Sequence, residues 1–313
     1  MEGQDGMGTA ELISLQLRMF LIMLLGLFFR KKNIISQEGK KNLTDLVIYL
    51  ILPCNIVKSF MIEFDGSVLM NFGLILLISV VIQVFCAGLA RVLYRGVQTG
   101  HKPVLMYATV ASNAGFLGNP VAEGVFGSMG LALASVYLIP QRIVMWSAGV
   151  SYFTKGSDRK TILKRVLTHP CIIAVAVGMV LMLTQVSLPS FLDAALKDIG
   201  SCNTAMSMLV IGTILADVKP KEMLDKSVFL FSGLRLLLIP LVVWLGCLLF
   251  RVDGLVTGVS VLLAAMPAAG TTAILAAKYD GDAVYASKCV VLSTVLSLAV
   301  IPVWSMILLD GIV

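Results

Sequence analysis

Long runs without a single charged residue recur along this sequence, for example over 68–90, 255–277 and 289–309. A bilayer core about 30 Å thick is crossed by roughly 20 apolar residues in an α-helix, so runs of this length predict transmembrane helices. Hydrophobic residues make up 58% of the 313 residues and charged residues only 13%, a balance that a water-soluble domain could not bury. The sequence therefore predicts an all-α integral membrane protein.

Ten candidate transmembrane helices follow from these runs. They cover approximately residues 12–29, 43–61, 68–90, 103–126, 129–154, 170–186, 190–216, 227–250, 255–277 and 284–309. The first run follows an acidic start and lacks a small-residue cleavage site, so we expect a retained helix rather than a cleaved signal peptide. A soluble helical protein with a buried core is disfavoured because runs of this length recur so often.

Lysine and arginine gather in every second connection between the predicted helices. The connections 30–42, 91–102, 155–169 and 217–226 hold most of them, whereas the alternate connections carry only Lys58, Lys197 and Arg251. Basic connections stay on the cytoplasmic side of a membrane. We therefore expect a multi-pass protein of the cell membrane with both termini outside the cytoplasm. The net charge of +6 is then a topology signal and requires no nucleic-acid partner.

The basic connection 155–169 divides the chain into two halves, 1–154 and 170–313, with five predicted helices each. Because five is an odd number, the second half must enter the membrane upside down relative to the first. Inverted repeats of this kind are the architecture of many secondary transporters. We predict two inverted five-helix repeats joined by this connection.

Two of the predicted helices are interrupted at corresponding places in the two halves. In the fourth, the run 112–120 contains two asparagines, two glycines and a proline, and in the ninth the run 266–272 reads Met-Pro-Ala-Ala-Gly-Thr-Thr. Glycine and proline are poor helix formers, and a broken backbone in lipid must face a cavity or other protein. Paired breaks in matching helices indicate the substrate site of a transporter, so we expect the fourth and ninth helices to be unwound and to cross there.

The residues of the fourth helix also resemble a known family. The run Ser-Asn-Ala-Gly-Phe-Leu-Gly-Asn-Pro at 112–120 is similar to the Asn-Thr-Gly-Phe-Leu-Gly-Ile-Pro signature of the auxin efflux carrier family, and 26–36, 50–55, 235–240 and 266–269 agree with it. The resemblance implies ten helices in two inverted repeats whose fourth and ninth helices cross where they are unwound, as in plant auxin carriers and sodium/bile-acid symporters.

Bacterial members of that family are similar to malate and malonate permeases, and this chain looks like the compact prokaryotic type. It departs from the family pattern at Asn119, where an apolar residue is usual, and at Arg142. Both departures bear on which substrate it takes.

An anion is the substrate that the charges within the predicted helices favour. Each broken helix presents a half-helix N-terminus, whose free N–H groups and partial positive charge attract anions. Near the middle of the predicted helices the charged residues are Arg18, Arg142 and Arg235, and the nearest carboxylate, Glu123, follows the fourth-helix break toward the outer end of that helix. We therefore expect a small organic anion such as a carboxylate to bind.

Arg142 is the first candidate to pair with a substrate carboxylate, because a guanidinium can donate two parallel hydrogen bonds to it. Gln141 beside it would add a donor. The alternative is that Arg142 neutralises a helix C-terminus or bonds to carbonyls between helices. We expect Arg235 to be structural, and we assign no role to Arg18.

The remaining candidate substrate-binding residues lie in or near the breaks, or in the second and seventh predicted helices. They are Asn113, Gly118, Asn119, Pro120, Pro267, Thr271 and Thr272 for the breaks, and Asn55 and Asn203 for the other two helices. Asn113, Thr271 and Thr272 could also replace water around a sodium ion. For Asn55 and Asn203 the alternative is a hydrogen bond between helices.

No enzyme chemistry is indicated by the sequence. It has no Ser/His/acid or His-Glu-x-x-His arrangement, no Gly-x-x-x-x-Gly-Lys-Ser/Thr loop for ATP, and its six cysteines lack Cys-x-x-Cys spacing. We expect no catalytic residue, no metal centre and no resident cofactor.

A secondary carrier is the function that we expect, with a channel or uniport pore and a transporter-derived sensor as alternatives. Sodium symport or uncoupled anion transport is favoured over proton coupling, because buried Asp, Glu or His residues commonly relay protons and only Glu123 comes near the break. The expected partners are a small organic anion and the lipid bilayer. A homodimer is left open, since the close-packing motif Gly-Leu-Val-Thr-Gly at 254–258 serves within a chain as readily as between chains.

The predicted orientation can be tested by labelling single engineered cysteines from outside sealed cells, in a background without the native cysteines. We expect sites near Asp193 and Asp253 to react and sites near Lys40 and Gly156 to stay protected. Reaction of a site at Gly156 would contradict the inverted arrangement.

Overall fold

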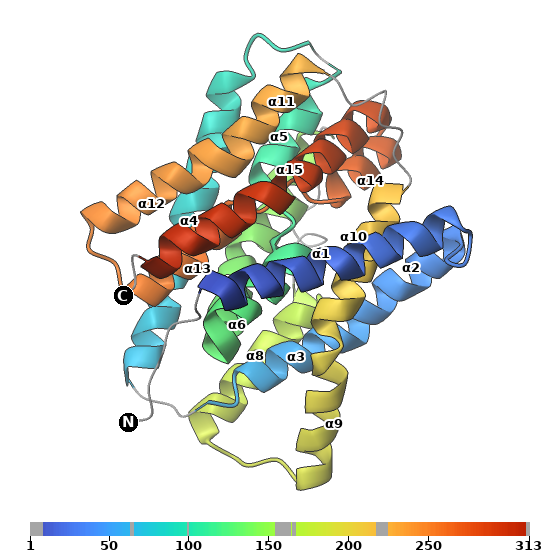
Figure 1. Cartoon of the computed structure of the whole chain (residues 1–313). Helices are drawn as coiled ribbons and strands as arrows, with labels where there is room; N and C mark the ends of the chain where they lie inside the picture. Colours follow the sequence, from blue (N-terminus) through green and yellow to red (C-terminus); the bar gives the residue numbers. More distant parts are fainter. Residues whose placement is uncertain are drawn as a thin grey trace.

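The computed structural model describes residues 9–62, 66–98, 100–153, 164, 167–216 and 225–310, and this part of the chain is a bundle of helices (Figure 1). Its residues form no β-strand beyond one isolated bridge. The predicted all-α class is confirmed. Most of the predicted connection 155–169 lies outside the described residues, as do Gly156 and residues 217–224.

Helices and π-helical turns, the latter labelled η, account for most of the described residues. In chain order they are α1 (Thr9–Lys31), α2 (Gln37–Leu46), η1 (Val47–Ile51), α3 (Leu52–Ser59), α4 (Gly66–Leu93), α5 (Lys102–Val110), η2 (Ala114–Gly118), α6 (Asn119–Val144), η3 (Met145–Gly149), α8 (Pro170–Thr184), α9 (Ser190–Ser201), α10 (Asn203–Ala216), α11 (Lys226–Gly233), η5 (Leu234–Leu238), α12 (Ile239–Leu249), α13 (Gly254–Ala264), α14 (Thr271–Lys278) and α15 (Ala283–Asp310).

Five helical stretches of the described residues are long and apolar enough to cross a membrane: Gly66–Leu93, Ala114–Gly149, Ser190–Ala216, Lys226–Leu249 and Ala283–Leu309. Pro170–Thr184 and Gly254–Ala264 are apolar but shorter. Helix is present within every one of the ten predicted runs, whereas the count of ten membrane crossings stays a prediction.

One boundary differs from that expected. The second helix begins at Gln37 rather than near residue 43, because the Ser36 hydroxyl caps it by accepting a hydrogen bond from the N–H of Gly39. Its first turns are polar and contain no long apolar run. The boundary between the fourth and fifth predicted helices agrees with the expectation, because the backbone of α6 leaves the helical conformation at Gly127, with φ 67° and ψ −160°.

The helices form two groups that pack mainly within themselves (Figure 1). We call α1, α2, α3, α8, α9 and α10 the flanking group, and α4, α5, α6 and α11 to α15 the crossing group. In the flanking group α1 and α10 approach backbone to backbone: a Cβ added to Gly26 would lie 2.3 Å from the carbonyl oxygen of Leu209, and one added to Gly212 would lie 2.0 Å from that of Met23. Small residues at these two positions permit the close contact.

Helix α13 is enclosed by the crossing group. It contacts α4, α6, α12 and α15, and its residues from Val256 to Ala264 are buried. The Gly-Leu-Val-Thr-Gly motif at 254–258 opens this helix, and Thr257 and Gly258 are buried within the chain. The motif therefore gives no support to a dimer contact, and the homodimer stays untested.

The turn at Gly127 supplies a test of the fold. Its φ and ψ fall in a region that only glycine adopts without strain, so Gly127→Ala should destabilise the protein by about 1–3 kcal/mol and lower its melting temperature by several degrees. The matched control is Gly246→Ala in α12, where an added Cβ meets no atom within 4 Å and alanine should stabilise the helix by about 0.5–1 kcal/mol. Equal melting temperatures for the two variants would contradict the strained turn.

Candidate functional site

The two predicted breaks lie against each other. Helix α5 ends at Val110 and α13 ends at Ala264, and their chains then pass side by side in extended form. The N–H of Asn113 donates to the carbonyl of Pro267 at 2.7 Å, the N–H of Ala269 donates to that of Ala111 at 3.0 Å, and Ser112 and Ala268 form an antiparallel bridge. The predicted unwinding and meeting of these helices is confirmed.

The first break is shorter than the sequence suggests. It covers Ala111 to Asn113, and the backbone then winds into η2 and α6. Gly118 is the last residue of η2, and an added Cβ there would lie 2.7 Å from the Leu263 side chain. Pro120 is the second residue of α6 and directly follows the π-helical turn η2, so the helix that starts at Ala114 lacks one N–H donor at this position. Pro267 lies in the second break, and its carbonyl accepts the bond from Asn113.

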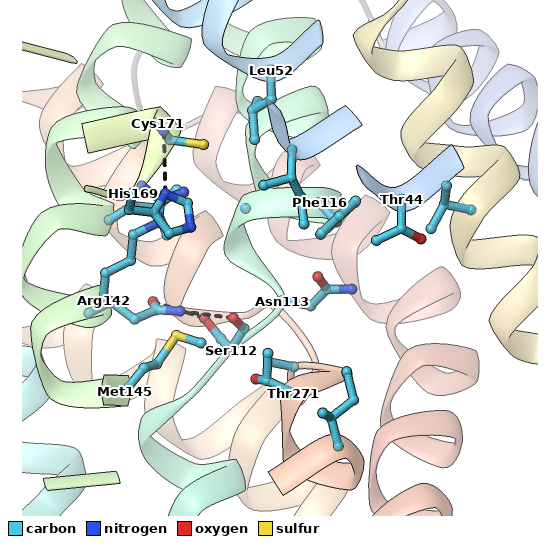
Figure 2. Close-up of a pocket in the computed structure, with 18 of the residues that line it drawn as sticks. Thr44, Leu52, Ser112, Asn113, Phe116, Arg142, Met145, His169, Cys171 and Thr271 are labelled. Carbon is cyan, nitrogen blue, oxygen red and sulfur yellow. Dashed lines mark hydrogen bonds between the residues drawn. The ribbon is translucent and has the colours of Figure 1, made fainter. Parts of the chain in front are cut away.

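A cavity of about 250 Å³ opens beside these breaks, between the two helix groups. The crossing group lines it with Ser112, Asn113, Gly115, Phe116, Leu138, Gln141, Arg142, Met145, Ala269, Gly270, Thr271 and Ile274, and the remaining lining residues are Thr44, Ile48, Leu52, His169, Cys171, Val210, Ile211 and Ile214. Figure 2 shows Arg142 and His169 on one side of it and Asn113 and Thr44 on the other. The volume lies below the ~300–1,000 Å³ usual for drug-sized ligands and therefore suits a small molecule.

The N-terminal ends of both half-helices face this cavity. Asn113 and Gly115 stand at the start of η2, which continues into α6, and Gly270 and Thr271 stand at the start of α14. Free N–H groups at such ends carry partial positive charge. The cavity wall at the breaks is therefore electropositive without any side chain.

Arg142 adds a full positive charge to the same wall. It comes from the last turn of α6, its side chain is buried, and its Nη1 has no hydrogen-bond partner among the described residues. Its Nη2 lies 3.8 Å from the position that a Cβ on Gly115 would occupy, which places the guanidinium beside the first turn of η2. Within the described part of the chain no carboxylate pairs with Arg142. A buried guanidinium with an unused donor is suited to an anionic ligand.

Gln141 bonds to the first break through its side-chain amide and also lines the cavity. Its Nε2 donates to the carbonyl of Ser112 at 2.8 Å, and the Ser112 hydroxyl donates to its Oε1 at 3.1 Å (Figure 2). Because an amide nitrogen carries two N–H donors and one of them fixes the extended segment, the expectation that Gln141 adds a donor to the substrate stays a prediction.

His169 lines the cavity although no motif in the sequence singles it out. It precedes α8, where its Nδ1 accepts a hydrogen bond from the N–H of Cys171 at 3.3 Å (Figure 2). Burial, and next the charge of Arg142, lower the pKa of His169 to about 3, so the imidazole is neutral at pH 7. The one sequence signal is its position directly before Pro170, at a helix start.

The other break residues divide between the cavity and the protein interior. Asn113 and Thr271 line the cavity, and the Thr271 hydroxyl accepts from the Tyr107 hydroxyl at 3.2 Å. Asn119 and Thr272 are fully buried outside its lining, and neither amide atom of Asn119 nor the Thr272 hydroxyl has a partner within the described ranges. The described residues hold no cluster of three His, Cys, Asp or Glu side chains that could bind a metal.

Asn55 and Asn203 meet at a different place, around Glu123. The Nδ2 of Asn55 donates to Glu123 Oε2 at 2.8 Å, and Asn203 lies beside the same carboxylate without completing a bond from its own Nδ2. Asn55 lies in α3 and Asn203 begins α10, so this cluster links the flanking group to α6. Neither asparagine lines the cavity.

Comparison with known proteins agrees with this architecture. The chain matches the model of the membrane transport protein family over residues 12–162 and 157–305. It is 29% identical to an uncharacterized transporter of Methanothermobacter thermautotrophicus, covering 96% of this chain and 99% of that protein. It is 27% identical to one of Methanocaldococcus jannaschii, covering 93% and 96%, and 24% identical to the uncharacterized transporter YfdV of Escherichia coli, covering 84% and 87%.

The matched ranges extend over nearly the whole chain, and they contain both breaks and all but the last four residues of the long apolar helices. The chain is therefore a multi-pass membrane transporter that belongs to the membrane transport protein family, the auxin efflux carrier family that its motifs resemble.

Proposed function

We propose that this protein is a secondary transporter that carries small organic anions, such as carboxylates, by alternating access. The observation that carries the proposal is the buried Arg142 guanidinium in the cavity wall, whose Nη1 has no partner in the part of the chain that the structure describes. A substrate carboxylate beside it would accept from that nitrogen and from the N–H groups at the starts of η2 and α14. Asn113 and Thr271 would orient the rest of the molecule.

The charges around the cavity support an anion over a cation. Among the described residues no Asp or Glu lines the cavity, and His169 is neutral at pH 7. Arg142 is then the charged side chain among the described lining residues, so a small carboxylate would neutralise its charge. An inorganic or organic cation would meet an unpaired guanidinium at short range.

The position of the cavity supports alternating access. It lies between the flanking and crossing groups, whose mutual contacts come mainly from α1, α3 and α10 on one side and α6, α15 and η2 on the other. Movement of one group against the other would open the cavity to either side of the membrane in turn. We propose that the chain consists of two inverted five-helix repeats and that both groups draw helices from each repeat. We also propose that it lies in a cell membrane with both termini outside the cytoplasm.

Anion binding can be measured by thermal shift on the purified protein with acetate, malonate, succinate and malate. A ligand that binds only the folded state raises the melting temperature. Arg142→Gln should weaken binding of the best anion about 30-fold or more, because a charged hydrogen-bond partner worth about 2–5 kcal/mol is lost. The matched control Arg18→Gln, at an exposed arginine of α1, should bind like the parent. Equal affinities for the parent and the Arg142 variant would contradict the assigned site.

Counterflow in proteoliposomes separates a carrier from a pore. With the best anion of the thermal screen trapped inside, uptake of a trace of its radioactive form should saturate and should exceed uptake into empty vesicles. A carrier that exposes its cavity to one side at a time exchanges substrate in this way. Ohmic single-channel current carried by the same anion would instead support a channel.

A further inference from the structure

The C-terminal ends of α5 and α13 lie close together at the two breaks, which we call the crossing. The N-terminal ends of η2 and α14 also lie there. In an unbroken α5 helix the N–H of Asn113 would bond to the carbonyl of Thr109, but it bonds to Pro267. Helix α13 ends at Ala264, and the carbonyl of Met266 follows it in the extended segment, so it too has no helical partner. Two carbonyls, one in the last turn of α5 and one just beyond the C-terminal end of α13, are therefore left without helical bonds in the protein interior.

Arg235 supplies hydrogen bonds to both of these carbonyls. Its Nε donates to the carbonyl of Met266 at 3.0 Å and its Nη1 donates to the carbonyl of Thr109 at 3.2 Å. The side chain is only 3% exposed, and no carboxylate of the described residues pairs with it. One guanidinium thus bonds to carbonyls at the C-terminal ends of both broken helices. These negative helix ends offset the free-energy cost of removing the guanidinium from water.

The local backbone holds this side chain at the crossing. Arg235 lies in η5, a π-helical turn between α11 and α12, and such turns widen a helix and leave carbonyls without regular partners. The carbonyl of Leu236 in that turn accepts a hydrogen bond from the Trp304 Nε1 of α15 at 3.0 Å. The irregular turn is therefore held in position from a neighbouring helix.

We infer that Arg235 is the resident cation of the crossing, and that it occupies the place that an exchangeable cation such as sodium would take on the freed carbonyls of Thr109 and Met266. Freed carbonyls of broken helices are the ligands with which transporters coordinate sodium. In this chain the guanidinium is covalently attached and already holds both oxygens. Sodium is then not needed at these two carbonyls. Arg142 supplies the positive charge on the side of the breaks that binds the anion, and Arg235 takes the place of a cation on the other side.

The inference deepens the proposed transport function, because it assigns the coupling-ion position, but the contacts of Arg235 hold whether or not the substrate is an anion. Its test therefore uses the melting temperature of the purified full chain without any carboxylate. Arg235→Ala should lower the melting temperature by about 5 °C or more, since two buried carbonyls lose their donors. Methylguanidinium at low concentration should restore at least half of that loss, whereas methylammonium at equal ionic strength should not.

Arg142→Ala is the matched control, because it removes a buried arginine from the opposite side of the same breaks. It should show no recovery with methylguanidinium, since Arg142 holds no freed carbonyl. Arg235→Lys covers the case in which the alanine variant does not fold: it should retain part of the stability, and methylguanidinium should not raise it. The parent should melt at the same temperature in sodium, potassium and choline chloride.

Three results would overturn the inference. The first is an Arg235→Ala variant as stable as the parent. The second is an Arg235→Ala variant whose melting temperature rises no more with methylguanidinium than with methylammonium. Arg235 would then stabilise the fold by packing alone. The third is a sodium-specific rise in the melting temperature of the parent, which would mean that the crossing still takes an exchangeable cation.

Discussion

The pair of backbone hydrogen bonds between the two broken helices is the constraint on which the rest of this structure depends. The bond from Asn113 to Pro267 and the bond from Ala269 to Ala111 satisfy backbone groups that the breaks release. In a membrane interior such groups have no water to bond with, and each unsatisfied one would cost several kcal/mol. The interruption in one helix is therefore stabilised by the interruption in the other, placed directly against it.

The two breaks also separate the positive helix ends from the negative helix ends. The ends with free N–H groups face the cavity together with Arg142, while the ends with free carbonyls face Arg235. The two arginines thus act in opposite senses. Arg142 adds positive charge to an already positive wall and keeps a donor unused, which favours an anion, whereas Arg235 neutralises the negative helix ends and has its donors engaged.

Several features of the site were predictable because they depend on local chemistry. Proline, glycine and asparagine in the fourth and ninth runs disfavour a continuous helix wherever they stand, so the breaks were expected. The contacts of Gln141, Asn55 and Asn203 were not, because each depends on a partner far away in the sequence: Gln141 bonds to Ser112, and Asn55 bonds to Glu123. His169 was missed for the same reason, since only the packing of the helix groups brings it to the cavity.

The sequence by itself determined that this chain is an α-helical membrane protein with two interrupted helices, because burial of apolar runs and backbone hydrogen bonding are local requirements. Only the tertiary structure decided which polar residues face the cavity. Asn113 and Thr271 reach it, whereas Asn119 and Thr272, close to them along the chain, are enclosed by packing. The physical reason is that a side chain's exposure is set by the helices packed around it, and residue spacing alone does not specify them.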